Sequence, residues 1–245
     1  MNTGTPHGLD IDRIAFFGRT YAEYRDMFGL EEAVLGMGLI LDCPGGASSF
    51  ALEASRKGFD VTACDVLYDQ SAVALFEKGK KDISHVFEKF DAVSHLYVWD
   101  YYRNKEEVMT LRKKSLDLFV EDFCRCSAEG SYMRAALPHL PFPDGMFSLV
   151  LSANFLFLYG DRLDLDFHKT CLKELMRICS GELRIFPLVG LDAKPYCYLD
   201  EIVTFLDAEG IETEILKVPF EFQRGANRMM KLRRKITVQG AGHEK

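Results

Sequence analysis

The sequence predicts an α/β fold whose sheet is mostly parallel and ends in an antiparallel strand. Short apolar runs alternate with amphipathic segments along most of the 245 residues. This alternation is typical of parallel strands with right-handed crossovers and helices on both faces of the sheet. The last two apolar runs follow each other with only a short connection (PFEFQRGAN) between them. Because that connection is too short for a crossover, these two strands should pair antiparallel.

The first elements form a strand, turn, helix and strand unit that follows a tail and a helix. Residues 1–12 are polar and are expected to form a mobile tail. Residues 19–30 place Tyr21, Tyr24, Met27 and Phe28 at helical spacing, which predicts a helix with a core-facing stripe. The unit itself is predicted as a strand over 37–43, the turn PGGASS, a helix over 47–57 and a strand over 59–64.

A long helical stretch follows the second strand. Residues 67–128 are rich in charge and contain no strand signal, and helices are expected over 71–90 and 104–126. A crossover needs only about a dozen residues or slightly more, so the excess predicts a helical insertion or cap. We expect residues 1–245 to form a single domain that contains this insertion.

Regular alternation resumes after the insertion. The remaining elements are expected as strands over 131–135, 147–155, 182–189, 211–218 and 229–238 and as helices over 167–179 and 198–208. Gly210 follows the last helix, where a glycine commonly ends helical structure.

The charge balance disfavours a protein that binds nucleic acid by general electrostatic attraction. The formal net charge is −7 and the isoelectric point is about 5.4, whereas nucleic-acid-binding domains usually carry a basic face. One basic cluster lies near the C-terminus: Arg224, Arg228, Lys231, Arg233, Arg234 and Lys235. On an edge strand such charges typically prevent unwanted strand pairing, so we interpret them as solvated.

The cysteines and the apolar runs indicate a cytoplasmic protein with reduced thiols. The chain has seven cysteines, and the pair Cys124 and Cys126 lacks a second ligand pair at zinc-site spacing, so no metal is expected. The first 12 residues lack the basic and apolar regions of a signal peptide. No apolar run approaches the roughly 20 residues needed to cross a bilayer, so no membrane association is expected.

The turn after the first strand is a candidate nucleoside site. Gly45 and Gly46 let the backbone turn sharply and approach a ligand, and the following helix begins with free N–H donors. Ser48 and Ser49 either add donors or cap that helix. Asp65, at the end of the second strand, stands where such units accept ribose hydroxyls. The alternative is a tight turn and a strand-ending aspartate in an α/β protein of another purpose.

The turn also departs from the dinucleotide-binding fingerprint. G-x-G-x-x-G is absent, and Pro44 stands where that fingerprint has a glycine. This departure disfavours NAD and FAD as ligands.

Several segments together resemble the class I S-adenosylmethionine-dependent methyltransferases. They are LDCPGGASSFA, VTACD, LPFPDGMFSLVLS and ELRIFPL, and the resemblance spans residues 39–238 apart from the insertion. The segments FFGRTYAEY and PFEFQRGAN resemble poorly characterised bacterial members. The resemblance implies a Rossmann-like methyltransferase sheet and S-adenosylmethionine as the cofactor.

The resemblance also implies roles for particular residues. Asp42 would orient the methionine amino group, Gly45 and Gly46 would lie beneath the cofactor, and Asp65 would accept from the ribose. Val66 and Leu67 would flank the adenine. The cofactor contacts that we expect are Asp42, Pro44, Gly45, Gly46, Ser49, Asp65, Val66, Leu137, Ser152 and Asn154. Leu137 belongs to the loop after the third strand (134–137), which often has an acidic residue for the adenine amino group but reads RAAL here.

The methyl acceptor and any catalytic base stay open. No N/D-P-P-Y/F sequence follows the fourth strand, which together with the acidic charge favours a small-molecule acceptor. Asn154, Tyr159, His139 and His168 are candidate polar groups, and each of the last three has a structural interpretation beside the functional one. Trp99, in LYVWDYY, belongs either to a substrate lid or to a packing seam of the insertion.

Two other function classes remain open at this point. One is a Rossmann-type oxidoreductase that uses NAD, and the other is a non-catalytic module that binds S-adenosylmethionine.

Overall fold

The sheet has the predicted mixture of parallel and antiparallel strands. The computed structural model describes residues 8–127 and 130–235, and within them the sheet has seven strands in the order β3-β2-β1-β4-β5-β7-β6. The strands are β1 (Ile40–Asp42), β2 (Val61–Asp65), β3 (Tyr132–Arg134), β4 (Phe147–Ala153), β5 (Cys179–Phe186), β6 (Ile211–Lys217) and β7 (Arg228–Arg234). β1 to β5 are parallel, whereas β7 runs antiparallel to both β5 and β6. The predicted antiparallel ending is confirmed.

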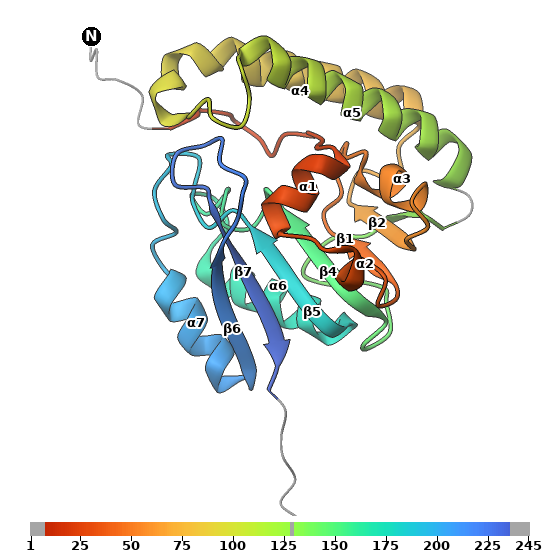
Figure 1. Ribbon diagram of the computed structural model, residues 1–245, viewed down its shortest axis with the longest axis vertical. Helices are drawn as coiled ribbons and strands as arrows, with labels where there is room; N and C mark the ends of the chain where they lie inside the picture. Colours follow the sequence, from red (N-terminus) through yellow and green to blue (C-terminus); the bar gives the residue numbers. More distant parts are fainter. Residues whose placement is uncertain (1–7, 128–129, 236–245) are drawn as a thin grey trace, which may run out of the picture.

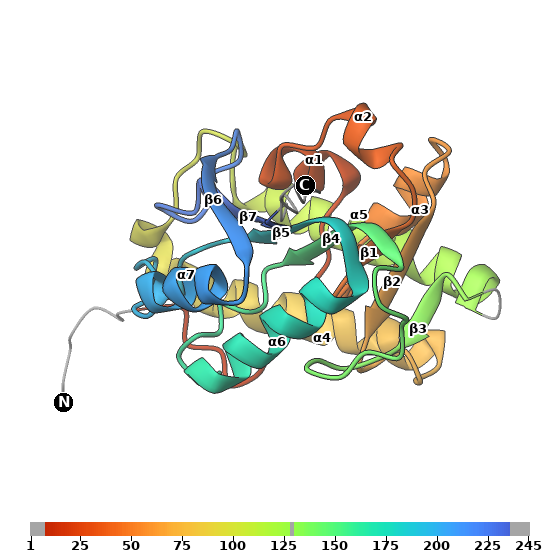
Figure 2. The ribbon, with the colours of Figure 1, turned by 90° about the horizontal axis from the view of Figure 1, so that it is seen from below.

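Helices cover both faces of the sheet, as predicted. They are α1 (Tyr21–Phe28), α2 (Glu32–Leu35), α3 (Phe50–Ser55), α4 (Ala72–Phe90), the 3₁₀ helix η1 (Asp91–Leu96), α5 (Lys105–Cys126), α6 (Leu165–Ile178) and α7 (Leu199–Ala208). Figure 2 shows α1 and α3 on one side of the sheet and α6 and α7 on the other. Successive residues of β1 point to opposite faces: Ile40 packs in the core beneath α1 and α3, and Leu41 packs in the core beneath α6 and α7.

A capping box fixes the start of α1 next to the glycine turn. The Thr20 hydroxyl accepts from the Glu23 N–H at 3.4 Å, and the Glu23 carboxylate accepts from the Thr20 N–H at 2.9 Å. Gly29 ends the helix with a left-handed φ of 57°. The predicted helix over 19–30 is therefore correct within two residues at each end.

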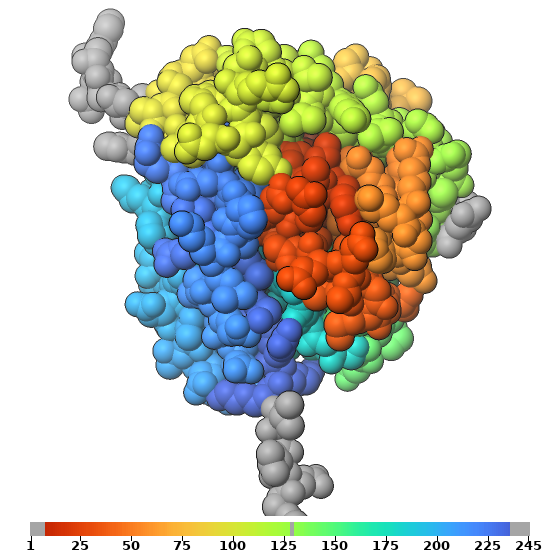
Figure 3. Space-filling model, viewed as in Figure 1, coloured from red at the N-terminus to blue at the C-terminus, as the bar shows by residue number. Residues whose placement is uncertain are grey.

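The insertion lies over the carboxyl ends of the parallel strands (Figure 1). It consists of α4, η1 and α5, which agrees with the helices predicted over 71–90 and 104–126; residue 128, the predicted end of the insertion, lies outside the described residues. Gly79 lets α4 approach α5 closely, because a Cβ there would lie 2.6 Å from Leu116 Cδ1. In Figure 3 the insertion, in yellow and green, adjoins both the α1 segment and the C-terminal strand pair.

Two expectations about the ends of the chain were wrong. Residues 8–12 are not a mobile polar tail, because Leu9 and Ile11 are buried and the Leu9 N–H donates to the Leu191 carbonyl at 3.1 Å; residues 1–7 lie outside the described part. β7 is not an edge strand, since it lies between β5 and β6. Two of its basic side chains are paired, Lys231 with Glu214 at 2.6 Å and Arg233 with Glu182, while Arg228, Arg233 and Arg234 are exposed to solvent. Residues 236–238 of the predicted last strand lie outside the described residues.

Within the described residues, no helix is long and apolar enough to cross a membrane.

Candidate functional site

A cavity of about 540 Å³ opens at the carboxyl ends of the parallel strands. Open α/β sheets bind their ligands at this edge, and the volume falls within the range of roughly 300–1,000 Å³ that is typical of small-molecule sites. The walls come from the glycine turn, the loops after β2, β3 and β4, the N-terminal segment, the insertion and the β6–β7 connection.

The glycine turn and the end of β2 are joined by direct hydrogen bonds. The Gly46 N–H donates to Asp65 Oδ2 at 3.1 Å, and the Leu67 N–H donates to Asp65 Oδ1 at 3.0 Å. The Tyr68 hydroxyl donates to the Gly46 carbonyl at 2.7 Å, and a Cβ on Gly45 would lie only 2.7 Å from that hydroxyl oxygen. Gly46 has a left-handed φ of 55°, so glycine is favoured there. The turn is therefore held in one conformation against the Asp65 carboxylate.

Asp65 is a buried carboxylate at the wall of the cavity. Its residue is 8% exposed. Burial raises its pKa above the ordinary aspartate value, while the N–H groups of Leu67 and Gly46 and the charge of Lys78 oppose that rise. Additional donors from a ligand would further stabilise the ionised form.

Seven of the ten residues expected to contact a cofactor line this cavity. They are Pro44, Gly45, Gly46, Asp65, Val66, Leu137 and Asn154. Val66 is half exposed, and Asn154 stands directly after β4 with a positive φ of 52°. Such a backbone conformation is uncommon outside glycine and is often found at functional sites. The geometry therefore brings together expected residues from the ends of four neighbouring strands, β1 to β4.

The other three expected residues lie outside the cavity lining. Asp42 is fully buried, and the Tyr24 hydroxyl donates to its carboxylate at 3.0 Å to Oδ1. Burial raises the pKa of Asp42 to about 8, although the Tyr24 hydrogen bond opposes the rise. The Ser49 hydroxyl donates to Glu53 at 2.9 Å, so it acts within α3. Ser152 Oγ is buried and has no hydrogen-bond partner among the described residues.

Several cavity residues were missed by the sequence reasoning, among them two polar residues near the start of α1. Tyr24 and Arg19 both line the cavity, yet Tyr24 was interpreted only as part of a core-facing stripe. Arg19 Nη1 donates to Glu23 Oε1 at 3.2 Å and to the Tyr102 hydroxyl at 3.3 Å. Arg19 Nε is buried without a partner among the described residues. The segment FFGRTYAEY was the available signal, because it carried part of the family resemblance.

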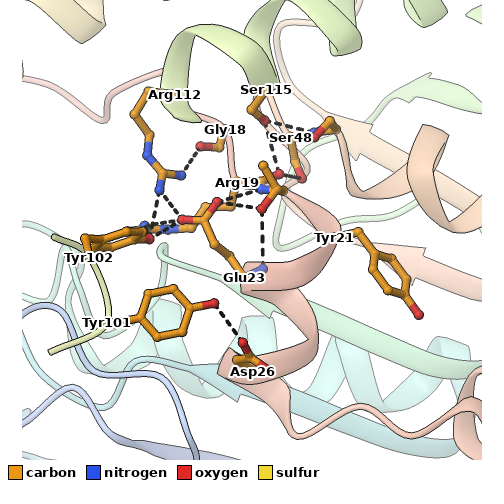
Figure 4. Close-up of polar contacts among 12 residues, drawn as sticks. Gly18, Arg19, Tyr21, Glu23, Asp26, Ser48, Tyr101, Tyr102, Arg112 and Ser115 are labelled. Atoms are coloured by element: carbon orange, nitrogen blue, oxygen red, sulfur yellow. Dashed lines mark hydrogen bonds and ion pairs between the residues drawn. The ribbon is translucent and has the colours of Figure 1, made fainter. Parts of the chain in front are cut away.

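A buried polar cluster of Glu23, Tyr102 and Arg112 holds Arg19 in place (Figure 4). Arg112 is fully buried, donates to the Gly18 carbonyl at 2.6 Å and pairs with Glu23. Burial alone would raise the pKa of Glu23, but Arg112 and Arg19 outweigh it and lower that pKa to about 2. Glu23 is thus a carboxylate shared by two guanidinium groups.

Ser115 ties the insertion to the glycine turn. Its hydroxyl accepts from the Ser49 N–H at 3.0 Å and lies 3.1 Å from the carbonyl oxygens of Arg19 and Ala47. The insertion helix α5 is therefore fastened directly to the start of α3.

The remaining candidates divide between the core and the cavity. His168 is buried rather than on the surface, and its ring stacks on Tyr196 at 4.6 Å between centroids; neither His168 nor His139 lines the cavity. Tyr159 does line it, and its hydroxyl accepts from the Ala15 N–H at 3.1 Å.

Trp99 packs edge-on against Phe222 and Phe90 and does not line the cavity. This position favours the packing seam over the substrate lid.

Within residues 8–127 and 130–235, no three or more His, Cys, Asp or Glu side chains are grouped so that they could hold a metal.

The chain has a clear relative in an archaeon. It is 31% identical over 227 residues to Uncharacterized protein MJ0045 of Methanocaldococcus jannaschii, which corresponds to 92% of this chain and 99% of that protein. The chain belongs to the family of that protein. The members expected from the sequence were bacterial, whereas this relative is archaeal, and its name gives no activity. No protein-family profile matches the chain.

Solved structures with similar folds include several methyltransferases. A SAM-dependent methyltransferase from Aquifex aeolicus has a TM-score of 0.40 and 16% identity, covering 86% of this chain and 90% of that chain. Magnesium protoporphyrin IX methyltransferase from Synechocystis PCC 6803 with bound SAM has a TM-score of 0.42 and 12% identity, covering 83% and 73%. Because both scores are below 0.5, we base the functional proposal on the geometry of this chain.

Proposed function

We propose that this protein is an S-adenosylmethionine-dependent methyltransferase that acts on a small molecule. The observation that carries the proposal is the hydrogen bond between the Gly46 N–H and Asp65 Oδ2, 3.1 Å long, at the wall of the cavity. A nucleoside site on a parallel sheet needs a close backbone approach after the first strand and a carboxylate after the second. Here the two are held together by one bond.

The residues around the cavity fit a nucleoside with an amino-acid tail. Asp65 would accept from the ribose hydroxyls, and Val66 and Leu137 would contact the adenine from the loops after β2 and β3. Arg19 Nε, buried without a partner among the described residues, would donate to the cofactor carboxylate. Asp42 would act on the amino group through Tyr24, since Tyr24 stands between Asp42 and the cavity.

The chain's own contribution to the reaction is binding, orientation and exclusion of water. S-adenosylmethionine, when bound, would supply an electrophilic methyl carbon and a thioether leaving group. The N-terminal segment and the insertion close the cavity above the strand ends. Asp65 is the only carboxylate among the described lining residues, and no histidine is among them. We therefore expect the acceptor to enter the cavity with its reacting atom already unprotonated.

A small molecule fits the charge and shape of the site better than nucleic acid. The cavity is enclosed by elements from both ends of the chain, and the net charge of −7 opposes attraction of a phosphate backbone.

Thermal melting with S-adenosylmethionine, S-adenosylhomocysteine, NAD or no ligand tests the proposal. A ligand that binds only the native state at 100 times its Kd stabilises it by about 2.7 kcal/mol. That corresponds to a rise in Tm of roughly 5–10 °C for a chain of this size. We expect this rise with the two sulfur nucleosides and none with NAD.

The other outcomes point to the alternative functions. A rise with NAD alone would indicate an oxidoreductase and contradict the proposal. A rise with S-adenosylmethionine without methyl transfer to any acceptor in a broad panel would indicate a binding module.

A further inference from the structure

We propose that the methyl acceptor is an apolar, ring-bearing molecule with a single polar end, bound against an aromatic wall of the cavity. This inference rests on the proposed function and adds the class of the acceptor. The aromatic wall consists of Phe87, Phe90, Tyr97, Phe220 and Phe222, all of which line the cavity.

Four of the five rings of the aromatic wall form a continuous surface from two distant parts of the chain, and Phe220 adjoins them through Tyr102, which contacts both Phe220 and Phe222. Phe90 stacks nearly parallel on Phe222, with centroids 5.9 Å apart and an interplanar angle of 6°. Tyr97 lies 4.4 Å from Phe90 and 4.7 Å from Phe222 between ring centroids. Phe87 and Phe90 come from α4, whereas Phe220 and Phe222 come from the β6–β7 connection. The insertion therefore supplies three of the five rings, Phe87, Phe90 and Tyr97, and the β6–β7 connection supplies the other two.

Each cation that lines the cavity beside this wall already has one carboxylate partner. Lys78 pairs with the buried Asp82 at 2.9 Å, and the Arg19 guanidinium is bonded to Glu23 and lies over the Phe220 ring at 5.4 Å. A polyhydroxylated acceptor would leave hydroxyl groups without partners against the rings, which is costly in a buried site. A flat apolar body would gain from ring contacts and from burial of its surface.

Two polar groups are free to meet the polar end of such an acceptor. Within the described residues, neither the Tyr97 hydroxyl nor the Asn154 side-chain amide makes a hydrogen bond, and both residues line the cavity. Burial raises the pKa of Tyr97 to about 12, although nearby Arg19 opposes the rise. The Tyr97 hydroxyl thus stays protonated at neutral pH and can donate.

Isothermal titration calorimetry on the protein saturated with S-adenosylhomocysteine tests the inference. The probes are 2-naphthol, which has an apolar ring body and one hydroxyl, and myo-inositol, a ring with hydroxyls on every carbon. We expect 2-naphthol to bind with a negative heat-capacity change, as apolar burial requires, and myo-inositol not to bind.

Two variants with matched controls locate the binding. Phe87→Leu should weaken 2-naphthol binding about tenfold through the lost ring contact. Phe142→Leu should not weaken 2-naphthol binding. Phe142 is as buried as Phe87 (both are 5% exposed), but it lies in the core on the other face of the sheet. Tyr97→Phe should also weaken binding, whereas Tyr198→Phe, on the exposed surface, should leave it unchanged. Thermal melting of each variant checks that it is folded.

The inference is overturned if 2-naphthol does not bind, if myo-inositol binds equally well, or if the paired variants behave alike. Binding of S-adenosylhomocysteine is measured first in the same titration. Its absence would contradict the proposed function, whereas its presence without 2-naphthol binding would contradict only the class of acceptor.

Discussion

The backbone nitrogen of Gly46 lies 3.1 Å from Oδ2 of Asp65, so the turn after β1 and the carboxylate after β2 form one hydrogen-bonded unit. The bond joins residues 19 positions apart in the sequence. Because both residues line the cavity, a change at either one should alter the same ligand site.

Replacement of Gly46 by alanine should weaken binding of S-adenosylhomocysteine. The φ of 55° disfavours any residue with a Cβ, and that Cβ would lie 3.0 Å from the Phe17 carbonyl oxygen. We expect a loss of about 1 kcal/mol in the free energy of unfolding from the left-handed backbone alone, and a clear loss of affinity by calorimetry.

Gly58→Ala is the matched control for Gly46→Ala. Gly58 also has a positive φ, of 89°, but a Cβ there meets no atom within 4 Å. The Gly58→Ala variant should lose a similar free energy of unfolding and should bind S-adenosylhomocysteine with the affinity of wild type. Equal affinities in the two variants would show that the conformation of the turn does not matter for binding.

Replacement of Glu23 by glutamine should destabilise the protein mainly at neutral pH. Glu23 has a pKa lowered from its ordinary 4.5 to about 2, so its contribution is present above pH 4.5 and is lost as the pH falls toward 2. At pH 7 the variant leaves a buried guanidinium short of its counter-charge, which typically costs about 3–5 kcal/mol. Urea unfolding at about pH 7 and pH 3 should show that the difference in unfolding free energy between Glu23→Gln and wild type is smaller at the acidic pH.

Glu121→Gln serves as the control for this pH dependence. Glu121 is exposed and lies 4.0 Å from Arg56, so its removal should change little at either pH. A gap for Glu23→Gln that stays constant between the two pH values would contradict the ion-pair account.

Replacement of Asp42 by asparagine should stabilise the protein, increasingly so at higher pH. Burial raises the pKa of Asp42 from its ordinary 3.8 to about 8. Its contribution to stability is therefore fully present below pH 3.8 and is lost as the pH rises through about 8. Asparagine does not ionise, so the Asp42→Asn variant should lack this pH dependence. The difference in unfolding free energy between the variant and wild type should therefore grow with pH, with a slope of at most about 1.4 kcal/mol per pH unit. Urea unfolding at pH 5 and 8 measures the slope, and a difference independent of pH would refute the assigned pKa direction.

Trp99→Ala should leave the affinity for S-adenosylhomocysteine unchanged. Trp99 is 37% exposed and packs edge-on against Phe90 and Phe222 without lining the cavity. We expect a loss of about 1 kcal/mol in unfolding free energy from the two edge contacts. A large loss of affinity in a folded variant would contradict a role for Trp99 in packing alone.

Local patterns were sufficient to predict the architecture but not the burial of isolated residues. The antiparallel β6–β7 pair followed from the length of one connection, and the insertion followed from an excess of helical residues between two strands. Leu9 and Ile11 stand singly in a polar segment and have no periodicity, so only tertiary contacts reveal their burial. The interior position of β7 depends on pairing with β5, which no local pattern encodes.

In the candidate site too, features set by local sequence patterns were predictable, whereas features set by tertiary contacts were not. Asp65 and the double glycine were predictable because each follows a recognisable strand. The position of the Arg19 side chain depends on a hydrogen bond to Tyr102, 83 residues away. It also depends on an ion pair with Glu23, which Arg112 holds in turn. The sequence alone could not place this side chain. Asp42 was expected at the ligand, but it points beneath Tyr24 because side chains alternate along a strand.

Calorimetric titration of S-adenosylhomocysteine into wild type, Asp65→Asn and Asp69→Asn tests the central claim most directly. Asp69 is exposed, pairs with Arg134 at 3.1 Å and does not line the cavity, so it controls for loss of one negative charge nearby. We predict binding to wild type and to Asp69→Asn, and at least about tenfold weaker binding to Asp65→Asn, since hydrogen bonds to a charged acceptor contribute about 1.5–3 kcal/mol. Equal affinity for all three folded proteins, or no binding to wild type, would contradict the claim that this carboxylate holds the nucleoside.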